Sequence, residues 1–341
     1  MLKDIIEVIK ISGLKGFCQL LKHSRLLKTY GRNFTLMNAL IALEKCGVNK
    51  YLLSGTGLDI SSQQDLDSLT LAAVCEYLHE INVLTKLSPG VYRAKNPTQF
   101  GALLKAMYAC YAYHEPVQAM DKLLTKEYEY GQQVVRNDQY DAIASATLTS
   151  IFSYGLAQSV LKKVEVRALL DLGCGTGEFL FFLSRCNSSA KLYGADNSEK
   201  AIAQGRKAGF ESEKVKLFVE DIFDLENTVS QIDTHSIDIV SFMFVLHEFE
   251  DKQIQTILKT IQDLCPQSKI LLTELINKSS EEIQKARRSV FPELKFLHQF
   301  SKQMLRTPAE WKKLFSEVHL LAKIERTNQL TNHVCFLFTP D

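Results

Sequence analysis

An apolar, strand-like segment runs directly into three alternating glycines within residues 169–179, and this feature constrains the fold more than any other. Asp171 lies in the apolar segment, and Gly173, Gly175 and Gly177 follow it before an apolar, helix-like stretch begins. Glycine lets the chain turn sharply from a strand into a helix and lets a ligand approach the backbone closely. The segment therefore predicts a nucleotide-type binding loop at the carboxyl end of a parallel strand, with Asp171 and the three glycines as binding residues.

The residues that follow limit which nucleotide this loop can bind. A dinucleotide-binding fingerprint would have its last glycine where this chain has Glu178, and a carboxylate at a helix N-terminus repels a pyrophosphate. S-adenosylmethionine has no phosphate and carries a positive sulfonium, so it tolerates an acid there. A second strand ends in Asp196, which is placed to accept both ribose hydroxyls. A third strand at 215–219 leads to Asp221 and Ile222, which we expect beside the adenine.

The order of these residues resembles the class I S-adenosylmethionine-dependent methyltransferases over residues 165–275. From residue 165 onward, strands alternate with helices, which predicts a doubly wound, Rossmann-like α/β sheet. Two final strands, expected at 318–325 and 333–338, match the antiparallel pair that closes the seven-stranded sheet of that family. The resemblance therefore implies S-adenosylmethionine as the cofactor and residues 165–341 as the catalytic domain.

The part of the chain before this domain predicts helices and a small winged helix. Residues 1–30 have the spacing of two amphipathic helices, and 65–94 have the pattern of a helix–turn–helix followed by two short strands. We expect residues 1–100 to form a helical and winged-helix dimerisation domain, and thus a homodimer. The helical segment 101–164 is rich in tyrosine and is expected to form a roof over a substrate pocket.

A winged helix could instead bind DNA, which would make the chain a regulator that senses S-adenosylmethionine. The predicted recognition helix offers Glu76, His79 and Glu80 but no lysine or arginine, so it would repel a phosphate backbone. The net charge of +1 gives no general indication of a nucleic-acid partner either. We therefore expect a small-molecule substrate and no nucleic acid.

Cysteine usage and hydropathy bear on the compartment. The eight cysteines are scattered, form no C-x-x-C pair, and mostly lie among apolar residues, which is typical of reduced core thiols. Reduced cysteines fit a cytoplasmic protein. No apolar run is long enough to span a bilayer, so no membrane partner is expected.

A histidine follows the fourth strand of the predicted sheet, where side chains face the cofactor. His247 can titrate near neutral pH and act as a general base. With the winged-helix pattern before it, the pair His247 and Glu248 resembles the two-domain small-molecule O-methyltransferases, in which a histidine–acid pair is the base. Glu274 matches the glutamate that this family carries on the next strand. A second glutamate of the family has no counterpart, because Leu305 stands in its place.

A second histidine resembles a different group of enzymes. His298 lies 51 positions after His247, and this pair is similar to the ferric-iron-dependent α-keto acid C-methyltransferases, whose two histidines bind iron. In that family the metal holds the keto acid and stabilises its enolate, so that carbon is methylated. The resemblance implies His247 and His298 as iron ligands and Arg136 as an arginine near the substrate. A metal-free site, with His298 in a helical core, is left open.

Three functions follow in order of preference. The first is metal-assisted C-methylation of an α-keto acid-like substrate, with S-adenosylmethionine and iron as cofactors. The second is metal-free O-methylation, with His247 as general base and Glu274 as its orienting partner. The third is the DNA-binding regulator.

Overall fold

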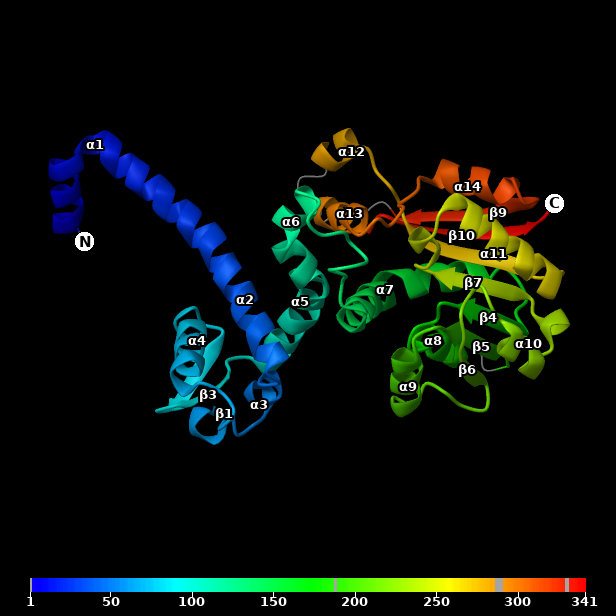
Figure 1. Cartoon of the computed structure of the whole chain (residues 1–341), viewed down its shortest axis with the longest axis horizontal. Coiled ribbons are helices and arrows are strands. Elements are labelled where there is room, and N and C mark those ends of the chain that lie inside the picture. Colours follow the sequence, from blue (N-terminus) through cyan, green and yellow to red (C-terminus); the bar gives the residue numbers. More distant parts are fainter. Residues whose placement is uncertain (1, 187–188, 286–290, 329–330) are drawn as a thin grey trace. The chain divides into compact units, whose positions relative to one another are not determined.

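The chain divides into two compact units in the computed structural model, Met1–Tyr111 and Ala112–Asp341. The boundary falls inside helix α5 (Pro97–Gln118), and the colours of Figure 1 follow the chain from one unit to the next. None of the helices in the described ranges combines the length and apolarity needed to cross a membrane. The structure describes residues 2–186, 189–285, 291–328 and 331–341.

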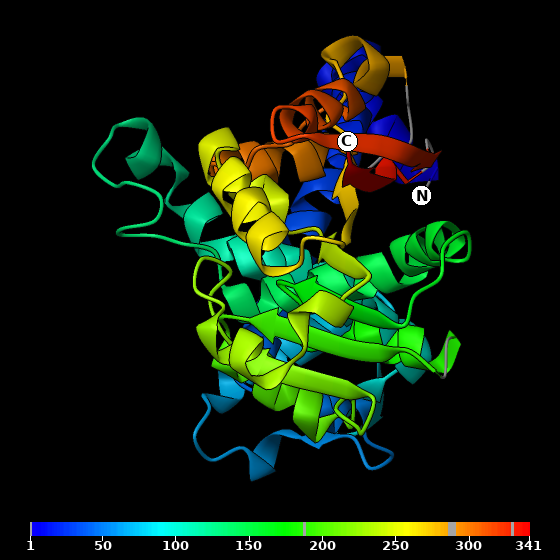
Figure 2. The same cartoon turned by 90° about the vertical axis from the view of Figure 1, so that its right-hand side faces the viewer.

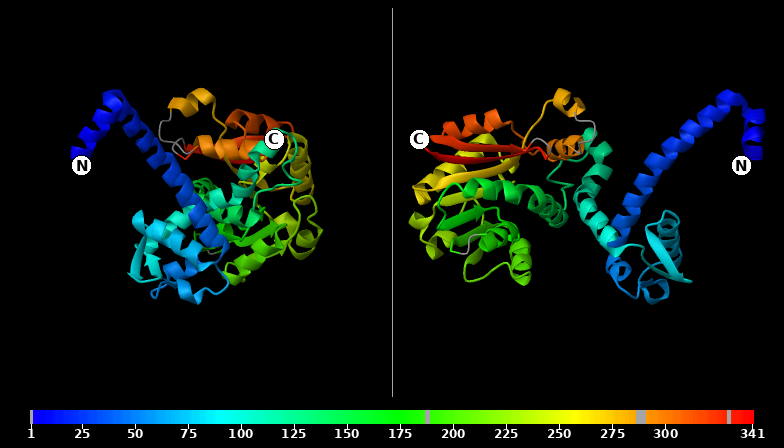
Figure 3. Two further views of the ribbon diagram at one scale, coloured as in Figure 1. Left: turned by 60° about the vertical axis from the view of Figure 1, so that its left-hand side comes forward. Right: turned by 180° about the vertical axis from the view of Figure 1, so that it is seen from behind.

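The first unit begins with a long helical segment that changes direction once. Gly13 has a φ of 68° and a ψ of 169°, so α1 is two helices joined by a kink, as the sequence predicts. Figure 3 shows this kinked segment in blue. The helices of this unit before α5 are α1 (Leu2–Leu26), the π-helical turn η1 (Leu27–Gly31), α2 (Arg32–Lys45), α3 (Asn49–Leu53), the 3₁₀ turn η2 (Ile60–Ser62) and α4 (Ser68–Glu80).

A helix and a hairpin occupy the region predicted as a winged helix. Helix α4 starts where the side chain of Asp67 accepts the backbone N–H of Thr70, which satisfies one of the free donors of the first turn. Glu76 on this helix accepts hydrogen bonds from two residues of the hairpin, Tyr92 and Lys86. The strands are β1 (Leu58–Asp59), β2 (Leu84–Ser88) and β3 (Val91–Ala94), in the order β1-β3-β2.

The second unit is a seven-stranded sheet in the order β6-β5-β4-β7-β8-β10-β9, which confirms the doubly wound α/β prediction. The first five of these strands are parallel, and β10 pairs antiparallel with both β8 and β9. The order reverses at β4, and ligands bind beyond the carboxyl ends of strands at such a point. The strands are β4 (Ala168–Leu172), β5 (Lys191–Asp196), β6 (Val215–Val219), β7 (Ile239–Met243), β8 (Lys269–Leu275), β9 (Leu320–Asn328) and β10 (His333–Pro340).

Helices cover both faces of this sheet (Figure 2). Leu170 and Leu172 point to one face, where they pack with side chains of α11 and α14, whereas Leu169 packs on the other face with α7, α8 and α9. The alternation follows from the period of two in a strand. The helices are α6 (Met120–Leu124), α7 (Asp138–Leu161), α8 (Glu178–Cys186), α9 (Glu199–Lys207), α10 (Glu226–Gln231), α11 (Asp251–Leu264), α12 (Ser280–Lys285), α13 (Phe291–Phe300) and α14 (Pro308–Ser316).

Two expectations about local structure are corrected. The segment 125–137, inside the stretch predicted as helical, forms turns and a short bridge between Tyr130 and Val134. His319 lies outside the strand expected around it, because its φ of 60° and its hydrogen bond to the carbonyl of Ser316 form a turn after α14. The proposed division of the chain at residues 100 and 164 stays a prediction.

Helix α9 packs closely on the glycine loop, which leads to a testable prediction. A Cβ atom on Gly205 would lie 2.0 Å from the carbonyl oxygen of Thr176, a contact that the backbone cannot relieve without moving. We expect Gly205→Ala to lower the free energy of unfolding by about 1–3 kcal/mol, the usual cost of overpacking. Urea unfolding measures this change. The control is Gly155→Ala in α7, where a Cβ meets no atom within 4 Å and helix propensity favours alanine. Equal stability of the two variants would contradict the prediction.

Candidate active site

The glycine loop after β4 combines tight packing with one open position. Gly173, Gly175 and Gly177 have φ values of 73°, 57° and 80°, which side chains rarely adopt. A Cβ on Gly173 would lie 2.5 Å from Val245, and one on Gly177 would lie 2.7 Å from Leu217. A Cβ on Gly175 would meet no atom within 4 Å. The outer glycines are therefore required by packing, and the middle one leaves bare backbone facing open space.

The acids predicted at the strand ends lie beside this loop. Asp196 ends β5, and its two carboxylate oxygens accept the backbone N–H groups of Gly175 (2.8 Å) and Ser198 (2.9 Å). A carboxylate can accept further hydrogen bonds at both oxygens. Asp221 is exposed two positions beyond β6, and Ile222 packs partly against the core. The structure therefore keeps Asp196 next to the loop, as the sequence predicts.

Asp171 lies inside β4 and is almost completely buried. Its Oδ1 accepts the hydroxyl of Ser241 at 2.6 Å, and its Oδ2 has no hydrogen-bond partner among the residues that the structure describes. Burial raises the pKa of Asp171 to about 7, and the hydrogen bond from Ser241 partly opposes this. A buried acceptor without a partner is rare in proteins. This atom and the open backbone at Gly175 fit a ligand such as S-adenosylmethionine, and the carboxylate of Asp196 lies beside the same loop.

His247 and Glu274 form a buried pair at the carboxyl end of the sheet. His247 lies in the 3₁₀ turn η4 (Leu246–Glu248) after β7, and Glu274 lies in β8. The Nδ1 of His247 is 2.8 Å from Oε2 of Glu274, and the backbone N–H of His247 donates to Oε1 at 3.2 Å. An ionised carboxylate only accepts, so Nδ1 carries a proton and Nε2 is free to accept one. His247 and Glu274 are 5% and 0% exposed, so water cannot compete for this bond.

The charges around His247 favour its protonated form. Burial opposes the imidazolium, but the charge of Glu274, its hydrogen bond and the charge of Glu248 together raise the pKa of His247 above its usual value. Oε1 of Glu248 lies 3.7 Å from Nε2 of His247. The geometry therefore supplies a base whose proton is stabilised once it is taken up.

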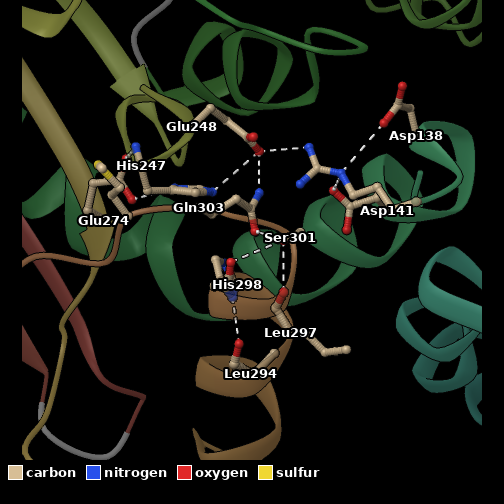
Figure 4. A network of polar contacts seen from close by, with 12 residues as sticks. Asp138, Asp141, His247, Glu248, Glu274, Leu294, Leu297, His298, Ser301 and Gln303 are labelled. Carbon is tan, nitrogen blue, oxygen red and sulfur yellow. Dashed lines mark hydrogen bonds and ion pairs between the residues drawn. The ribbon is translucent and has the colours of Figure 1, made fainter. Parts of the chain in front are cut away.

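An arginine from the segment before α7 contacts Glu248, the acid next to His247. Nη2 of Arg136 donates to Oε1 of Glu248 at 2.7 Å, and its Nε lies 3.3 Å from Asp141 and 3.5 Å from Asp138. Burial alone would raise the pKa of Glu248, but His247 and Arg136 lower it overall. The pKa of Asp141 is raised, because its burial outweighs the attraction of Arg136. Figure 4 shows Glu248 at the centre of these contacts.

His298 lies against His247, as the resemblance implies, but its ring is engaged elsewhere. The two ring centroids are 5.1 Å apart at an interplanar angle of 62°, and Nδ1 of His298 lies 2.7 Å from the carbonyl oxygen of Leu294 in the same helix. Burial, followed by the charge of His247, lowers the pKa of His298 to about 4. His298 is therefore neutral at ordinary pH.

The expected iron site is not supported by the side chains present. No group of three or more histidine, cysteine, aspartate or glutamate residues within the described ranges could hold a metal ion. His247 uses its Nδ1 for Glu274 and His298 uses its Nδ1 for Leu294, which leaves at most two ring nitrogens from this pair. Two nitrogens are fewer than the three protein ligands of an ordinary catalytic site. We therefore derive no chemical step through a metal.

The sequence did not predict the polar residues that surround Glu248. Gln303 lies in the loop after α13 and donates a hydrogen bond to Oε1 of Glu248. Ser301 and Tyr113 contact the other end of the Gln303 amide at 3.0 and 3.5 Å. Gln303 belongs to no motif, although it lies two residues before Leu305, which stands in the place of the second family glutamate.

Comparisons with known proteins identify the family of the domain that carries this site. Residues 164–325 match the family model described as a methyltransferase domain. An uncharacterised protein of Haemophilus influenzae is 32% identical over 122 residues, which are 34% of this chain. The chain spans 45% of the length of that curated relative.

Solved structures share the fold over nearly the whole chain. The LaPhzM protein has a TM-score of 0.68 at 17% identity and is matched over 94% of this chain and 99% of its own. The mitomycin 7-O-methyltransferase has a TM-score of 0.65 at 12% identity, over 95% and 99% of the two chains. Human N-acetylserotonin methyltransferase, solved with S-adenosylmethionine, has a TM-score of 0.62 at 16% identity, over 93% and 97%. At these identities the likeness establishes a common fold.

Proposed function

We propose that this class I S-adenosylmethionine-dependent methyltransferase of the two-domain type transfers its methyl group to an oxygen of a small molecule. The methyltransferase domain at residues 164–325 and the fold shared over both units are the premise of this proposal. The observation that carries it is the buried bond between Nδ1 of His247 and Glu274, which leaves Nε2 to take a proton.

The residues at the strand ends would hold the cofactor. Asp196 would accept the ribose hydroxyls, Asp221 and Ile222 would lie at the adenine, and the bare backbone at Gly175 would lie against the ligand. When it is bound, S-adenosylmethionine would supply an electrophilic methyl group on a sulfonium, whose S–C bond breaks on transfer so that the neutral thioether S-adenosylhomocysteine leaves. The packing of Gly173 against Val245 places this loop next to the turn that carries His247, so the donor and the base are held close together.

His247 would activate the acceptor hydroxyl. Its Nε2 accepts the hydroxyl proton as the oxygen attacks the methyl group, and the imidazolium that forms is stabilised by Glu274 through the Nδ1 hydrogen bond. Glu248, 3.7 Å from the same Nε2, adds a second negative charge that favours the proton on His247. This division of roles explains why the chain keeps two carboxylates beside one histidine.

Oxygen is favoured over carbon as the methylated atom, which corrects the order of preference given by the sequence. The C-methylation hypothesis has His247 and His298 as iron ligands and Arg136 as an arginine near the keto acid. Arg136 is instead in contact with Glu248 and Asp141, and the two histidines gain no third ligand within the described residues. Mitomycin 7-O-methyltransferase shares this fold, which further supports O-methylation.

The winged-helix region bears on the partner of the chain. We propose a small-molecule acceptor rather than DNA, because Glu76 on the helix that would read DNA is occupied by Lys86 and Tyr92 of its own hairpin. A homodimer through residues 1–100 and a cytoplasmic location stay predictions.

An acceptor screen tests the proposed function. The full-length protein is incubated with methyl-labelled S-adenosylmethionine and a panel of hydroxyaromatic and α-keto acid compounds, with added iron or with a chelator. We expect label on the oxygen of a hydroxyaromatic compound at a rate that neither addition changes. Label on a carbon atom of a keto acid, or transfer that requires iron, would contradict the proposal.

A further inference from the structure

We infer, building on the proposed function, that Gln303 is a positioning residue that holds Glu248 by one carboxylate oxygen. The other oxygen of Glu248 is thereby left to bind a hydrogen-bond donor, a hydroxyl or an ammonium, that the acceptor molecule carries next to its reacting oxygen. The inference thus assigns a role to Gln303 and a chemical class to the substrate.

The loop that carries Gln303 is fixed to both histidines of the site. Lys302 adopts a left-handed conformation with a φ of 62°, which turns the chain after α13. The backbone N–H of Gln303 donates to the carbonyl of His298 at 2.8 Å, and that of Met304 donates to the carbonyl of His247 at 2.7 Å. Gln303 itself is 7% exposed. Backbone contacts therefore hold Gln303 in the site, and these contacts do not depend on its side chain.

The direction of the Gln303 amide follows from its partners. Its Nε2 donates to Oε1 of Glu248, and its Oε1 lies 3.0 Å from the hydroxyl of Ser301 (Figure 4) and 3.5 Å from the hydroxyl of Tyr113. The Ser301 hydroxyl also reaches the carbonyl oxygen of Leu297 at 2.8 Å, so Tyr113 is the donor that Gln303 does not share with this carbonyl. Turning the amide over would bring two acceptor oxygens together at Glu248. Burial raises the pKa of Tyr113 to about 12, so its hydroxyl keeps its proton and can donate. Glutamine is therefore held as a donor toward Glu248.

Both protein donors reach the same oxygen of Glu248. Arg136 and Gln303 donate to Oε1, and Nε2 of His247 lies near this atom as well. Within the described part of the chain, no protein hydrogen bond reaches Oε2, and Glu248 is exposed, so a ligand can approach this atom. Because a carboxylate oxygen can accept two hydrogen bonds, Oε2 can accept a donor of the acceptor molecule beside the base.

The charge of this region selects the group that can bind there. Three acidic side chains surround His247, namely Glu248, Glu274 and Asp141. Arg136 forms ion pairs with two of these acids, Glu248 and Asp141. These acids would repel a carboxylate on the acceptor molecule, because Arg136 already pairs with two of them. A neutral hydroxyl or an ammonium would instead donate to Oε2 of Glu248 and align the neighbouring oxygen with His247.

The first test compares catechol with phenol as methyl acceptors. The wild-type protein is expected to use catechol with a higher kcat/KM, because phenol has no second hydroxyl for Glu248. Gln303→Leu removes the donor with little change in size, and we expect it to lower kcat/KM for catechol roughly tenfold, the value of one hydrogen bond to a charged group, and for phenol far less. The control is Gln299→Leu, at an exposed residue of α13, the helix that precedes the loop of Gln303.

The second test does not need an acceptor. The pKa of the His247 imidazole is measured by NMR, with its signal assigned from its loss in His247→Asn. Gln303→Glu places a second carboxylate at Glu248, and the added negative charge is expected to raise this pKa above that of wild type and of Gln303→Leu. An unchanged pKa in Gln303→Glu would overturn the positioning role.

The outcomes separate the two proposals. If the wild type uses phenol as well as catechol, or if Gln303→Leu weakens both equally, the donor requirement is wrong although O-methylation stands. If the wild type transfers to neither compound, this counts against the proposed function, and the imidazole pKa still decides the role of Gln303.

Discussion

A His247→Gln variant is expected to lose methyl transfer by about 10²–10⁴-fold, the usual contribution of a general base, while it still binds S-adenosylmethionine. Glutamine can keep a hydrogen bond to Glu274 but cannot take a proton from the acceptor. Transfer of labelled methyl measures the activity, and calorimetry with S-adenosylmethionine shows that the cofactor site is intact. His319→Gln is the matched control, because His319 is exposed and lies in the turn after α14. Full activity of His247→Gln would contradict the proposed base.

If His247 is the general base, the rate of methyl transfer depends on pH in a direction that follows from its pKa. Only the neutral imidazole accepts a proton, so the rate rises with pH through the pKa of His247. Glu274 and Glu248 raise this pKa, so the midpoint is expected above about 6.5, the usual histidine value. Glu274→Gln removes the stronger of these attractions and is expected to move the midpoint to lower pH. A midpoint that moves upward in Glu274→Gln would contradict the orienting role of Glu274.

Asp196→Asn is expected to weaken the binding of S-adenosylmethionine by about 10–100-fold, since hydrogen bonds to a charged group are worth about 1.5–3 kcal/mol each. The substitution removes the charged acceptor for the ribose and weakens the bond to the backbone of Gly175, so the loop is affected as well. Calorimetry with the cofactor measures the change directly.

A matched control uses an aspartate at the opposite end of the sheet. Asp238 precedes β7 and accepts from the backbone and side chain of Arg167 before β4, so Asp238→Asn is expected to leave cofactor affinity unchanged. If Asp196→Asn and Asp238→Asn bind the cofactor with equal affinity, the ribose is held elsewhere.

The cofactor half of the site could be predicted because its signals are local. Three glycines at alternate positions after an apolar run permit a left-handed backbone, and all three adopt it. Asp196 could be placed because the carboxyl ends of neighbouring parallel strands meet at one edge of the sheet. The strand at 215–219 is observed with the predicted bounds.

The acceptor half could be predicted only where a motif was present. His247 and Glu274 are in contact, and Arg136 reaches Glu248 beside them; strand ends and family patterns had marked these residues as candidates. Gln303 could not be found in this way, since its role arises from a left-handed turn at Lys302 and from contacts between segments separated by 55 and 190 positions. The iron site is not supported because no group of three or more metal-ligating side chains is present within the described residues, and the spacing of two histidines cannot show this.

The contact between Gly173 and Val245 has a consequence for engineering new acceptors. The glycine loop after β4 and the turn that carries His247 touch each other there, and no room is left for even one methyl group between them. A redesign that inserts or enlarges residues at either place would alter both halves of the reaction at once.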